Sequence, residues 1–294
     1  MSHRPGLNRP HAKPQLEGFS AISLSELDAR AELLERMDQK YVVNNKVLDK
    51  ALEHWSPHFD ILDIDGNRSF RYDNCYFDDA DFKCYQQHQQ DRRVRFKVRT
   101  RLYTDSNTCF VEIKLKGPRG RTIKQRVPCS PEYFGMLDDS SREFIAKAYY
   151  AIYGRKFSFE LLPSIKVSYY RSTLAAIEGH ERITIDTQIQ FSCEDETFSV
   201  NPDLVIIETK SPNRNGLAEK ILRGLHQHPV SACSKYCIGM AVLGKVKRYN
   251  RFLKAMRKLQ LIPTPRQPQK PLELTNTGRI LNQSKHSSEE AHVI

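Results

Sequence analysis

Basic residues fall on every second position of three successive strand-like runs within a 36-residue stretch between Asp91 and Arg126. This stretch holds twelve Lys or Arg residues and three Asp or Glu residues. In a β-strand, residues two apart point to the same face of the sheet, so each run places its charges on one face. The runs are Arg95, Lys97, Arg99 and Arg101; Glu112, Lys114 and Lys116; and Lys124 and Arg126. The pattern predicts three strands that share one strongly cationic face.

A cationic sheet face allows two interpretations. It can be a solvated face of an antiparallel sheet. It can also curl inward, where a low dielectric strengthens its field enough to hold a polyanion. The net charge is +11, from 46 basic and 35 acidic residues, and about nine of these charges fall in this stretch. An anionic partner is therefore expected: nucleic acid, an anionic membrane surface, a nucleotide or polyphosphate.

Composition excludes several other classes of protein. No run of 18 apolar residues is present, and the first 15 residues lack the apolar core of a secretory signal, so we expect a cytoplasmic protein without a membrane segment. The seven cysteines are scattered and show no paired zinc spacing, which predicts reduced thiols. The 39% hydrophobic content is sufficient for a packed core.

The ends of the chain differ in composition from its centre. Residues 1–20 and 261–294 are rich in Pro, Ser, Gln, Lys and His, which predicts disordered tails around a domain at 21–260. Within the domain, the patterns predict a strand from Glu35, a helix capped by Asn44, a strand over 69–77, the three basic strands, and a helix over 141–153. A second antiparallel half and a helical C-terminal segment follow. We therefore expect an α+β fold.

Charged residues recur at a spacing of two on other predicted strands. Glu208 lies on the same face as Leu204 and Ile206, where a charge must be paired or bound to a ligand. The corresponding pairs are Asp38 with Lys40, Tyr169 with Arg171, Arg182 with Asp186, and Glu208 with Lys210. Many cations around one or two carboxylates are what phosphoryl transfer requires. The sequence has no GxxxxGK[ST] loop, GxSxG elbow or HExxH motif.

Eight short elements carry a more specific resemblance. They are ERMDQKYVV, KVRTR, FVEIKLK, IKQRVP, VSYYRS, ERITIDT, IIETK and CSKY. In this order, from Glu35 to Lys258, they resemble the VTC domain, the polyphosphate polymerase module of the triphosphate tunnel metalloenzyme (CYTH-like) superfamily. The resemblance implies an antiparallel β-barrel tunnel that is lined with Arg and Lys and flanked by helices, with the C-terminal helical segment packed against it.

The resemblance also implies an activity and a set of site residues. Its members are phosphotransferases that bind ATP with Mn²⁺ or Mg²⁺ and lengthen polyphosphate. Glu208 would hold the metal. The implied phosphate ligands are Lys40, Arg99, Arg101, Lys114, Lys124, Arg171 and Arg182. The implied substrate-binding residues are Tyr169, Lys210, and Ser234 and Lys235 at a helix start, where free N–H groups favour phosphate.

This chain departs from the family pattern at two places. Where relatives carry ExExK, it has Arg36, Asp38 and Lys40, and where they carry a further Lys before the SK element, it has Ala232. Three roles stay open. Asp38 can assist the metal or not. Glu112 can orient Lys114 or assist the metal, and Asp186 can pair with Arg182 or assist the metal.

Three functions remain in competition at this point. The first is a polyphosphate polymerase, which would be a stand-alone bacterial-type member without the sensor domain and membrane segments of eukaryotic complexes, and could work with a membrane-protein partner. The second is a tunnel-type triphosphatase acting on inorganic or nucleoside triphosphate. The third is a non-catalytic polyanion-binding module, whose binding would weaken steeply with salt. None of these requires sequence-specific recognition of nucleic acid.

Overall fold

The computed structural model describes residues 16–30 and 37–262. The tails predicted at 1–20 and 261–294 lie mostly outside these ranges, as does Arg36. The described residues differ from that prediction at both ends of the domain. Leu16 and Phe19 pack beside Trp55, and Leu261 packs beside Met256, because each apolar side chain covers a neighbouring helix or strand. The packed domain is therefore a few residues longer than the polar composition of its ends suggests.

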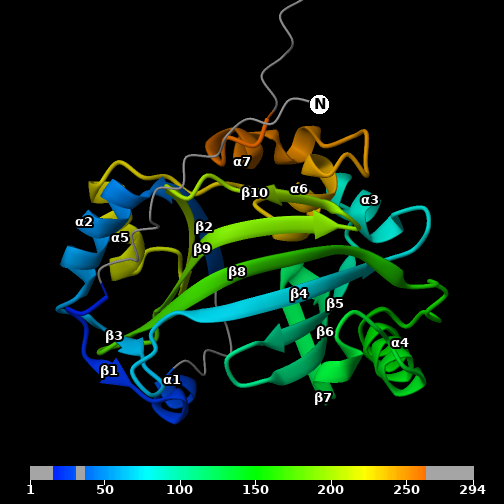
Figure 1. Ribbon diagram of the computed structural model, residues 1–294, viewed down its shortest axis with the longest axis horizontal. Helices are drawn as coiled ribbons and strands as arrows, with labels where there is room; N and C mark the ends of the chain where they lie inside the picture. The colour runs from blue at the N-terminus through cyan, green and yellow to red at the C-terminus, as the bar shows by residue number, and fades with distance from the viewer. Residues whose placement is uncertain (1–15, 31–36, 263–294) are drawn as a thin grey trace, which may run out of the picture. The chain divides into compact units, whose positions relative to one another are not determined.

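Antiparallel strands form most of one large sheet (Figure 1). Its main order is β2-β11-β9-β8-β4-β5-β6-β7. These strands are β2 (Met37–Asn44), β4 (Phe70–Asp78), β5 (Phe96–Tyr103), β6 (Thr108–Lys116), β7 (Thr122–Cys129), β8 (Leu162–Ala176), β9 (Arg182–Cys193) and β11 (Leu204–Ser211). Three short strands lie off this path: β1 (Ala21–Ile22), β3 (Phe59–Leu62) and β10 (Glu196–Ser199). The sheet curls on itself like a tunnel without closing, and among the described strands β2 and β7 form its two edges.

Seven α-helices within the described ranges accompany the sheet. They are α1 (Leu24–Arg30), α2 (Asn45–Trp55), α3 (Lys83–Gln89), α4 (Asp139–Tyr153), α5 (Leu217–Gly224), α6 (Lys235–Val242) and α7 (Leu253–Lys258). The predicted cap is confirmed, since the Asn44 side chain accepts a hydrogen bond from the Val47 amide at the start of α2. The mixed fold of an antiparallel sheet with flanking helices is confirmed as well.

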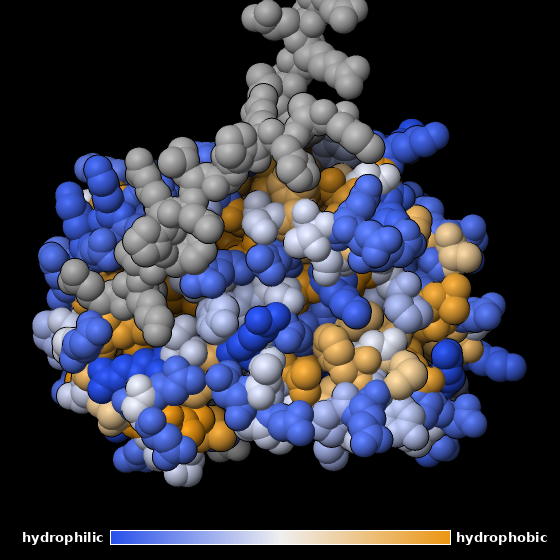
Figure 2. All heavy atoms as spheres, viewed as in Figure 1, coloured by the Kyte–Doolittle hydropathy of each residue, from blue (hydrophilic) through white to orange (hydrophobic). Residues whose placement is uncertain are grey.

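The two faces of the sheet have opposite character. On β6 the odd positions Val111, Ile113 and Leu115 are buried beneath α4. On β2, β9 and β11 the corresponding apolar face packs under α2 and α5. Apolar residues therefore cover the convex face, and the alternate positions carry the charged side chains to the concave face, together with the apolar ones that pack against α6 and α7. The view in Figure 2 is mostly hydrophilic with small apolar patches, as expected when the larger apolar clusters are buried.

Helix α6 lies against the concave face of β8 and β9 rather than outside the sheet. Gly239 makes this approach possible, because a Cβ atom there would lie 2.6 Å from Ile165 Cδ1 and 2.7 Å from Phe191 Cδ1. Both distances are shorter than a real contact allows. The close packing brings the first residues of α6 up to the charged part of the concave face.

Candidate functional site

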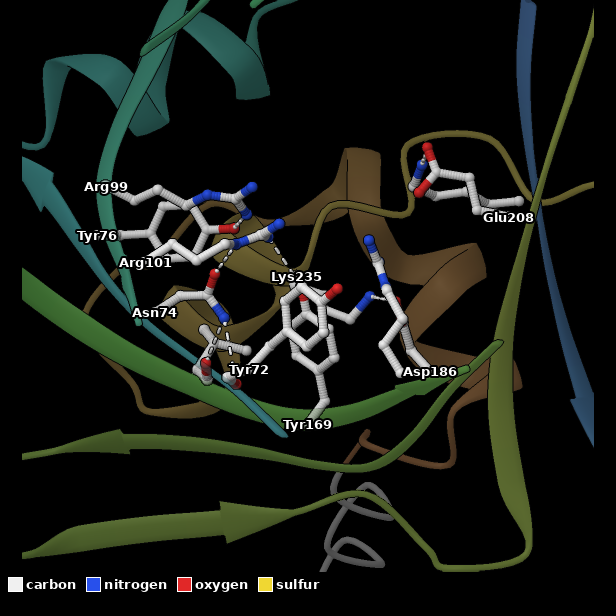
Figure 3. Close-up of polar contacts among 12 residues, drawn as sticks. Tyr72, Asn74, Tyr76, Arg99, Arg101, Tyr169, Asp186, Glu208 and Lys235 are labelled. Carbon is white, nitrogen blue, oxygen red and sulfur yellow. Dashed lines mark hydrogen bonds and ion pairs between the residues drawn. The ribbon is translucent and has the colours of Figure 1, made fainter. Parts of the chain in front are cut away.

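The charged side chains of the concave face point toward one another from two sides of the curled sheet (Figure 3). Arg99 and Arg101 extend from β5, and Glu208 and Asp186 extend from β11 and β9. The strand register explains part of this arrangement, since Lys40 of β2 lies directly opposite Glu208 of β11. The charges of these strands therefore meet inside the curl of the sheet.

The wall made by β5, β6 and β7 holds one carboxylate between two cations. Arg99 Nε donates to Glu112 Oε2 at 2.8 Å, and Lys124 Nζ lies 2.6 Å from Glu112 Oε1. Burial acts to raise the pKa of Glu112, but Arg99, Arg101 and Lys124 more than offset it, so the pKa lies far below its usual range. Glu112 is therefore ionised and fully engaged. Its ion-pair partners among the described residues lie on β5 and β7, and Lys114 of its own strand is not one of them.

The wall made by β8, β9 and α6 repeats this arrangement. Arg171 binds Asp186 through two hydrogen bonds of 2.6 and 2.8 Å, and Lys235 forms an ion pair with the same carboxylate. Burial opposes ionisation of Asp186, yet the two cations lower its pKa to about 2. Asp186 pairs with Arg171 and not with Arg182, because Arg171 lies directly opposite Asp186 in the β8–β9 register.

Neutral side chains around the Arg101 guanidinium join the two walls. Arg101 donates from Nε to Asn74 Oδ1 and from Nη2 to the Tyr169 hydroxyl, both at 2.9 Å. Tyr169 stacks on Tyr72 with ring centres 5.6 Å apart. Burial acts to raise the pKa of Tyr169, but Arg101 and Arg171 outweigh it and lower the pKa. The arrangement holds the guanidinium groups of Arg101 and Arg171 in fixed orientations.

Three of these positions on β4 were missed in the sequence. Tyr72, Asn74 and Tyr76 alternate along the strand and all face the concave side, and Tyr76 accepts a hydrogen bond from Arg99 at 3.0 Å. The signal was the same spacing of two that marks the basic strands. It is harder to recognise here because the residues are aromatic or neutral.

Glu208 has fewer partners than the other two inner carboxylates. Lys40 Nζ lies 2.8 Å from Glu208 Oε1, and this is the one ion pair that the described residues give it. Burial acts to raise the pKa of Glu208, but the fields of Lys40, Lys210 and Lys114 hold it well below the usual range. Glu208 is therefore an ionised carboxylate surrounded by positive charge.

Lys114 differs from the other cations of the site in its lack of a polar partner within the described part of the chain. Among the described residues it forms no hydrogen bond or ion pair, although it lies near Glu208. Burial and the neighbouring cations, Arg99 and Lys40 among them, lower its pKa well below that of an ordinary lysine. A partly desolvated amine among other cations and without a partner is unfavourably placed as an ammonium ion, and an anionic ligand would stabilise its charged form.

The start of α6 supplies further polar groups. Ser234 caps the helix and Lys235 is its first residue, which confirms the predicted helix start. Lys97 Nζ donates to Ser234 Oγ at 3.2 Å, so β5 and α6 meet at this point. Burial lowers the pKa of Lys97 as well.

Two further predicted residues, Lys210 and Arg182, lie two positions along their strands from Glu208 and its cross-strand partner. Lys210 on β11 is opposite both Arg182 on β9 and Asp38 on β2. Lys210 is close enough for its charge to act on Glu208 and Lys114. The structure thus brings the predicted residues onto one concave face.

The carboxylates of the concave face determine what kind of metal site the protein can form. Within residues 16–30 and 37–262, no three His, Cys, Asp or Glu side chains are grouped so as to hold a metal ion. Glu112 and Asp186 are each occupied by two cations, which leaves Glu208 as the carboxylate with the fewest partners. These residues fit a divalent cation that brings most of its ligands with it, as Mg²⁺ does when phosphates complete its coordination.

Nothing in the described helices is long and apolar enough to cross a bilayer.

A known protein family matches most of the chain. The VTC domain family matches residues 35–244, well over half of the chain. The chain therefore belongs to the VTC domain family. No curated protein matches it.

Several solved structures share some similarity with the chain. One is a putative adenylyl cyclase from Hippeastrum described as having a dominant triphosphatase activity, with 16% identity, a TM-score of 0.42, and coverage of 73% of this chain and 98% of that one. Another is the PH1819 protein from Pyrococcus horikoshii, with 15% identity, a TM-score of 0.40, and coverage of 72% and 99%. A third is a putative adenylate cyclase from Bacillus halodurans, with 12% identity, a TM-score of 0.35, and coverage of 81% and 97%.

Proposed function

We propose that this protein transfers the γ-phosphoryl group of ATP to inorganic phosphate or to the end of a growing polyphosphate chain, with Mn²⁺ or Mg²⁺ bound together with the substrate. The observation that carries the proposal is Lys114, a half-buried lysine without a hydrogen-bond or ion-pair partner among the described residues, close to the ionised Glu208. A triphosphate with its metal supplies both the anion that Lys114 lacks and the cation that Glu208 can accept.

In this proposal the cations of the concave face bind phosphate oxygens. Arg side chains can bind two oxygens at once, whereas Lys acts as a point charge, so the mixture holds a triphosphate in a defined position. The proposed phosphate ligands are Lys40, Arg99, Arg101, Lys114, Lys124, Arg171 and Arg182, assisted by Tyr169, Lys210, Ser234 and Lys235.

Glu208 is the proposed metal ligand. One carboxylate is sufficient where substrate phosphates complete the coordination, and a bound divalent cation would neutralise charge on the transferred group. The fixed side chains would act on the same charge: they hold donor and acceptor phosphates in line and stabilise the phosphoryl oxygens as charge shifts during transfer. Because Arg99, Arg101 and Arg171 are already oriented by Glu112, Asn74 and Asp186, little reorganisation is needed at that moment.

Incubation of the purified protein with ATP and Mn²⁺ or Mg²⁺, followed by gel electrophoresis of the product, tests the proposal. We expect long-chain polyphosphate whose amount increases with time and depends on the metal. Absence of chains with either metal, with and without added phosphate or short polyphosphate, would rule out a polymerase.

Hydrolysis of triphosphate is the second candidate, and the open edge of the sheet favours it. Lys124 and Arg126 on the edge strand β7 are exposed although they belong to the cationic wall, so water can reach this side of the site. The same assay separates the two reactions, because a triphosphatase releases inorganic phosphate without forming polymer. A polyanion-binding module would do neither and would keep its affinity in Glu208→Gln.

A further inference from the structure

The concave face changes character along β5 and β6. On β5 the inward residues run Lys97, Arg99, Arg101 and Tyr103, and on β6 they run Phe110, Glu112 and Lys114. The antiparallel register places Arg101 directly opposite Phe110. Cations therefore line one part of this wall, and aromatic rings take over toward the turn that joins the two strands.

Three rings form a continuous aromatic cluster at this end. Tyr72 meets Tyr103 edge to face with ring centres 4.9 Å apart, and Tyr103 meets Phe110 in the same way at 5.8 Å. All three side chains are half-buried, so each leaves part of its ring surface open to solvent. Rings that served only as core would be expected among the fully buried residues, as Phe96 and Phe77 are.

Two guanidinium groups stack on this cluster. The Arg126 Cζ lies 4.6 Å from the centre of the Phe110 ring, and Arg126 is exposed. Arg101 lies 5.1 Å from the centre of Tyr72 and 5.9 Å from that of Tyr103. Rings and guanidinium planes together are the surface on which proteins stack nucleobases, since every base offers a π-face.

Arg101 connects the aromatic cluster to the phosphate-binding wall. The same guanidinium that stacks on Tyr72 donates to Tyr169, which in turn lies against Arg171 and Lys235. A ligand with a polyanionic end and an aromatic end matches both surfaces in one orientation. Inorganic polyphosphate has no group that could use the aromatic end.

We propose that Tyr103, Phe110 and Arg126 form a nucleobase subsite, which stacks the base of a nucleoside triphosphate while its phosphates extend toward Lys114. This inference rests on the proposed triphosphate site and adds the feature that distinguishes ATP from inorganic tripolyphosphate. Tyr103, Phe110 and Arg126 are binding residues for the nucleoside and take no part in the transfer itself.

Calorimetric titration of the full chain with ATP and, separately, with inorganic tripolyphosphate tests the subsite, with the same divalent cation present in both. In Phe110→Leu and Tyr103→Leu, which keep apolar bulk and remove the ring, ATP is expected to bind about tenfold more weakly, equivalent to about 1.4 kcal/mol, while tripolyphosphate affinity stays unchanged. Phe198→Leu on β10 is the matched control, because Phe198 is an exposed aromatic residue on a strand away from this wall.

The outcomes separate the subsite from the site on which it depends. If either ring variant changes the two affinities equally, or changes neither, the nucleobase subsite is refuted while the triphosphate site stands. If the unmodified protein binds neither ligand, the proposed function fails first and the subsite fails with it. Circular dichroism of each variant confirms that the fold is retained, and Arg126→Met supplies a third variant should a ring substitution unfold the protein.

Discussion

Two opposite walls of the concave face carry the same arrangement, and a third carboxylate departs from it. Glu112 lies between Arg99 and Lys124, and Asp186 lies between Arg171 and Lys235. In both cases an Arg and a Lys neutralise one buried carboxylate. Glu208 has a single ion pair, with Lys40, among the described residues.

This difference in the number of partners indicates different roles for the three carboxylates. A carboxylate already neutralised by two cations attracts a metal ion less than one with a single partner, and it fixes both cations in position. A carboxylate with one partner and an excess of positive field can accept a further cation that arrives with phosphate. We therefore assign orientation of the cations to Glu112 and Asp186, and binding of the metal to Glu208.

Removing Glu112 or Asp186, the carboxylates that pair with two cations, is expected to have the largest effect on the free energy of unfolding. Asp186→Asn leaves Arg171 and Lys235 buried without their counter-charge, which should lower the free energy of unfolding by about 3–5 kcal/mol. Urea unfolding at neutral pH measures this, with Asp195→Asn in the exposed β9–β10 turn as the control. Glu208→Gln should cost clearly less stability. Equal losses for Asp186→Asn and Glu208→Gln would remove the distinction between the carboxylates.

The pH dependence of stability has a defined sign at Asp186. Its pKa in the folded protein is lowered to about 2, so its contribution is present above the ordinary aspartate pKa of about 3.9 and is lost as pH falls toward 2. The stability difference between wild type and Asp186→Asn should therefore be constant above about pH 5 and shrink below it. A difference that grows on acidification would contradict this assignment.

Glu208→Gln is expected to have the largest effect on turnover. Loss of the metal ligand should reduce phosphoryl transfer by on the order of 100- to 1000-fold, because the metal contributes several kcal/mol of charge stabilisation. Metal-free binding of tripolyphosphate should stay equal or become tighter, since a negative charge has left the wall. Product formation and calorimetry together check this prediction. Turnover within a fewfold of wild type would exclude Glu208 as the metal ligand.

Much of this comparison could be predicted from sequence, because it follows from strand periodicity. The spacing of two put the charges of each strand on one face, and the family resemblance implied a tunnel in which Arg99, Lys114 and Glu208 face the same interior. The pairing of the carboxylates could not be predicted, because it depends on cross-strand register. Asp186 meets Arg171 on the neighbouring strand rather than Arg182 on its own, and Glu112 reaches β5 and β7.

Other parts of the site lacked a sequence signal of the expected kind. Tyr72, Asn74 and Tyr76 carry no charge, so an analysis based on charge alternation passed over them. The buried position of Lys235 depends on Gly239, whose missing side chain lets α6 approach β8 and β9. Close packing of this sort cannot be inferred from a helix taken by itself.

Lys114→Met tests the unpaired cation. Tripolyphosphate affinity should fall by about 10- to 100-fold, the value of one or two charge-assisted hydrogen bonds, as measured by calorimetry. The melting temperature should stay the same or rise, because a half-buried lysine without a partner among the described residues is replaced by an apolar side chain of similar length. A large loss of stability would show that Lys114 already makes a stabilising interaction in the folded protein, and is not a free ligand for an anion.

The smallest expected effect concerns pH and the exposed edge of the β5–β7 wall. The Lys124 side chain keeps 33% of its surface exposed, but partial desolvation of its ammonium group, with the fields of Arg101 and Arg99, lowers its pKa to about 7 despite its ion pair with Glu112. Lys124 therefore loses its charge as pH rises through 7, and its attraction for phosphate weakens over the same interval. Tripolyphosphate titrates in this range too, so the informative quantity is the affinity of wild type relative to Lys124→Met at each pH. We expect this ratio to decline severalfold between pH 6 and pH 8, following the lost charge. A ratio that stays constant would mean that Lys124 keeps its proton or lies outside the phosphate site, and the two walls would then differ in function as well as in exposure.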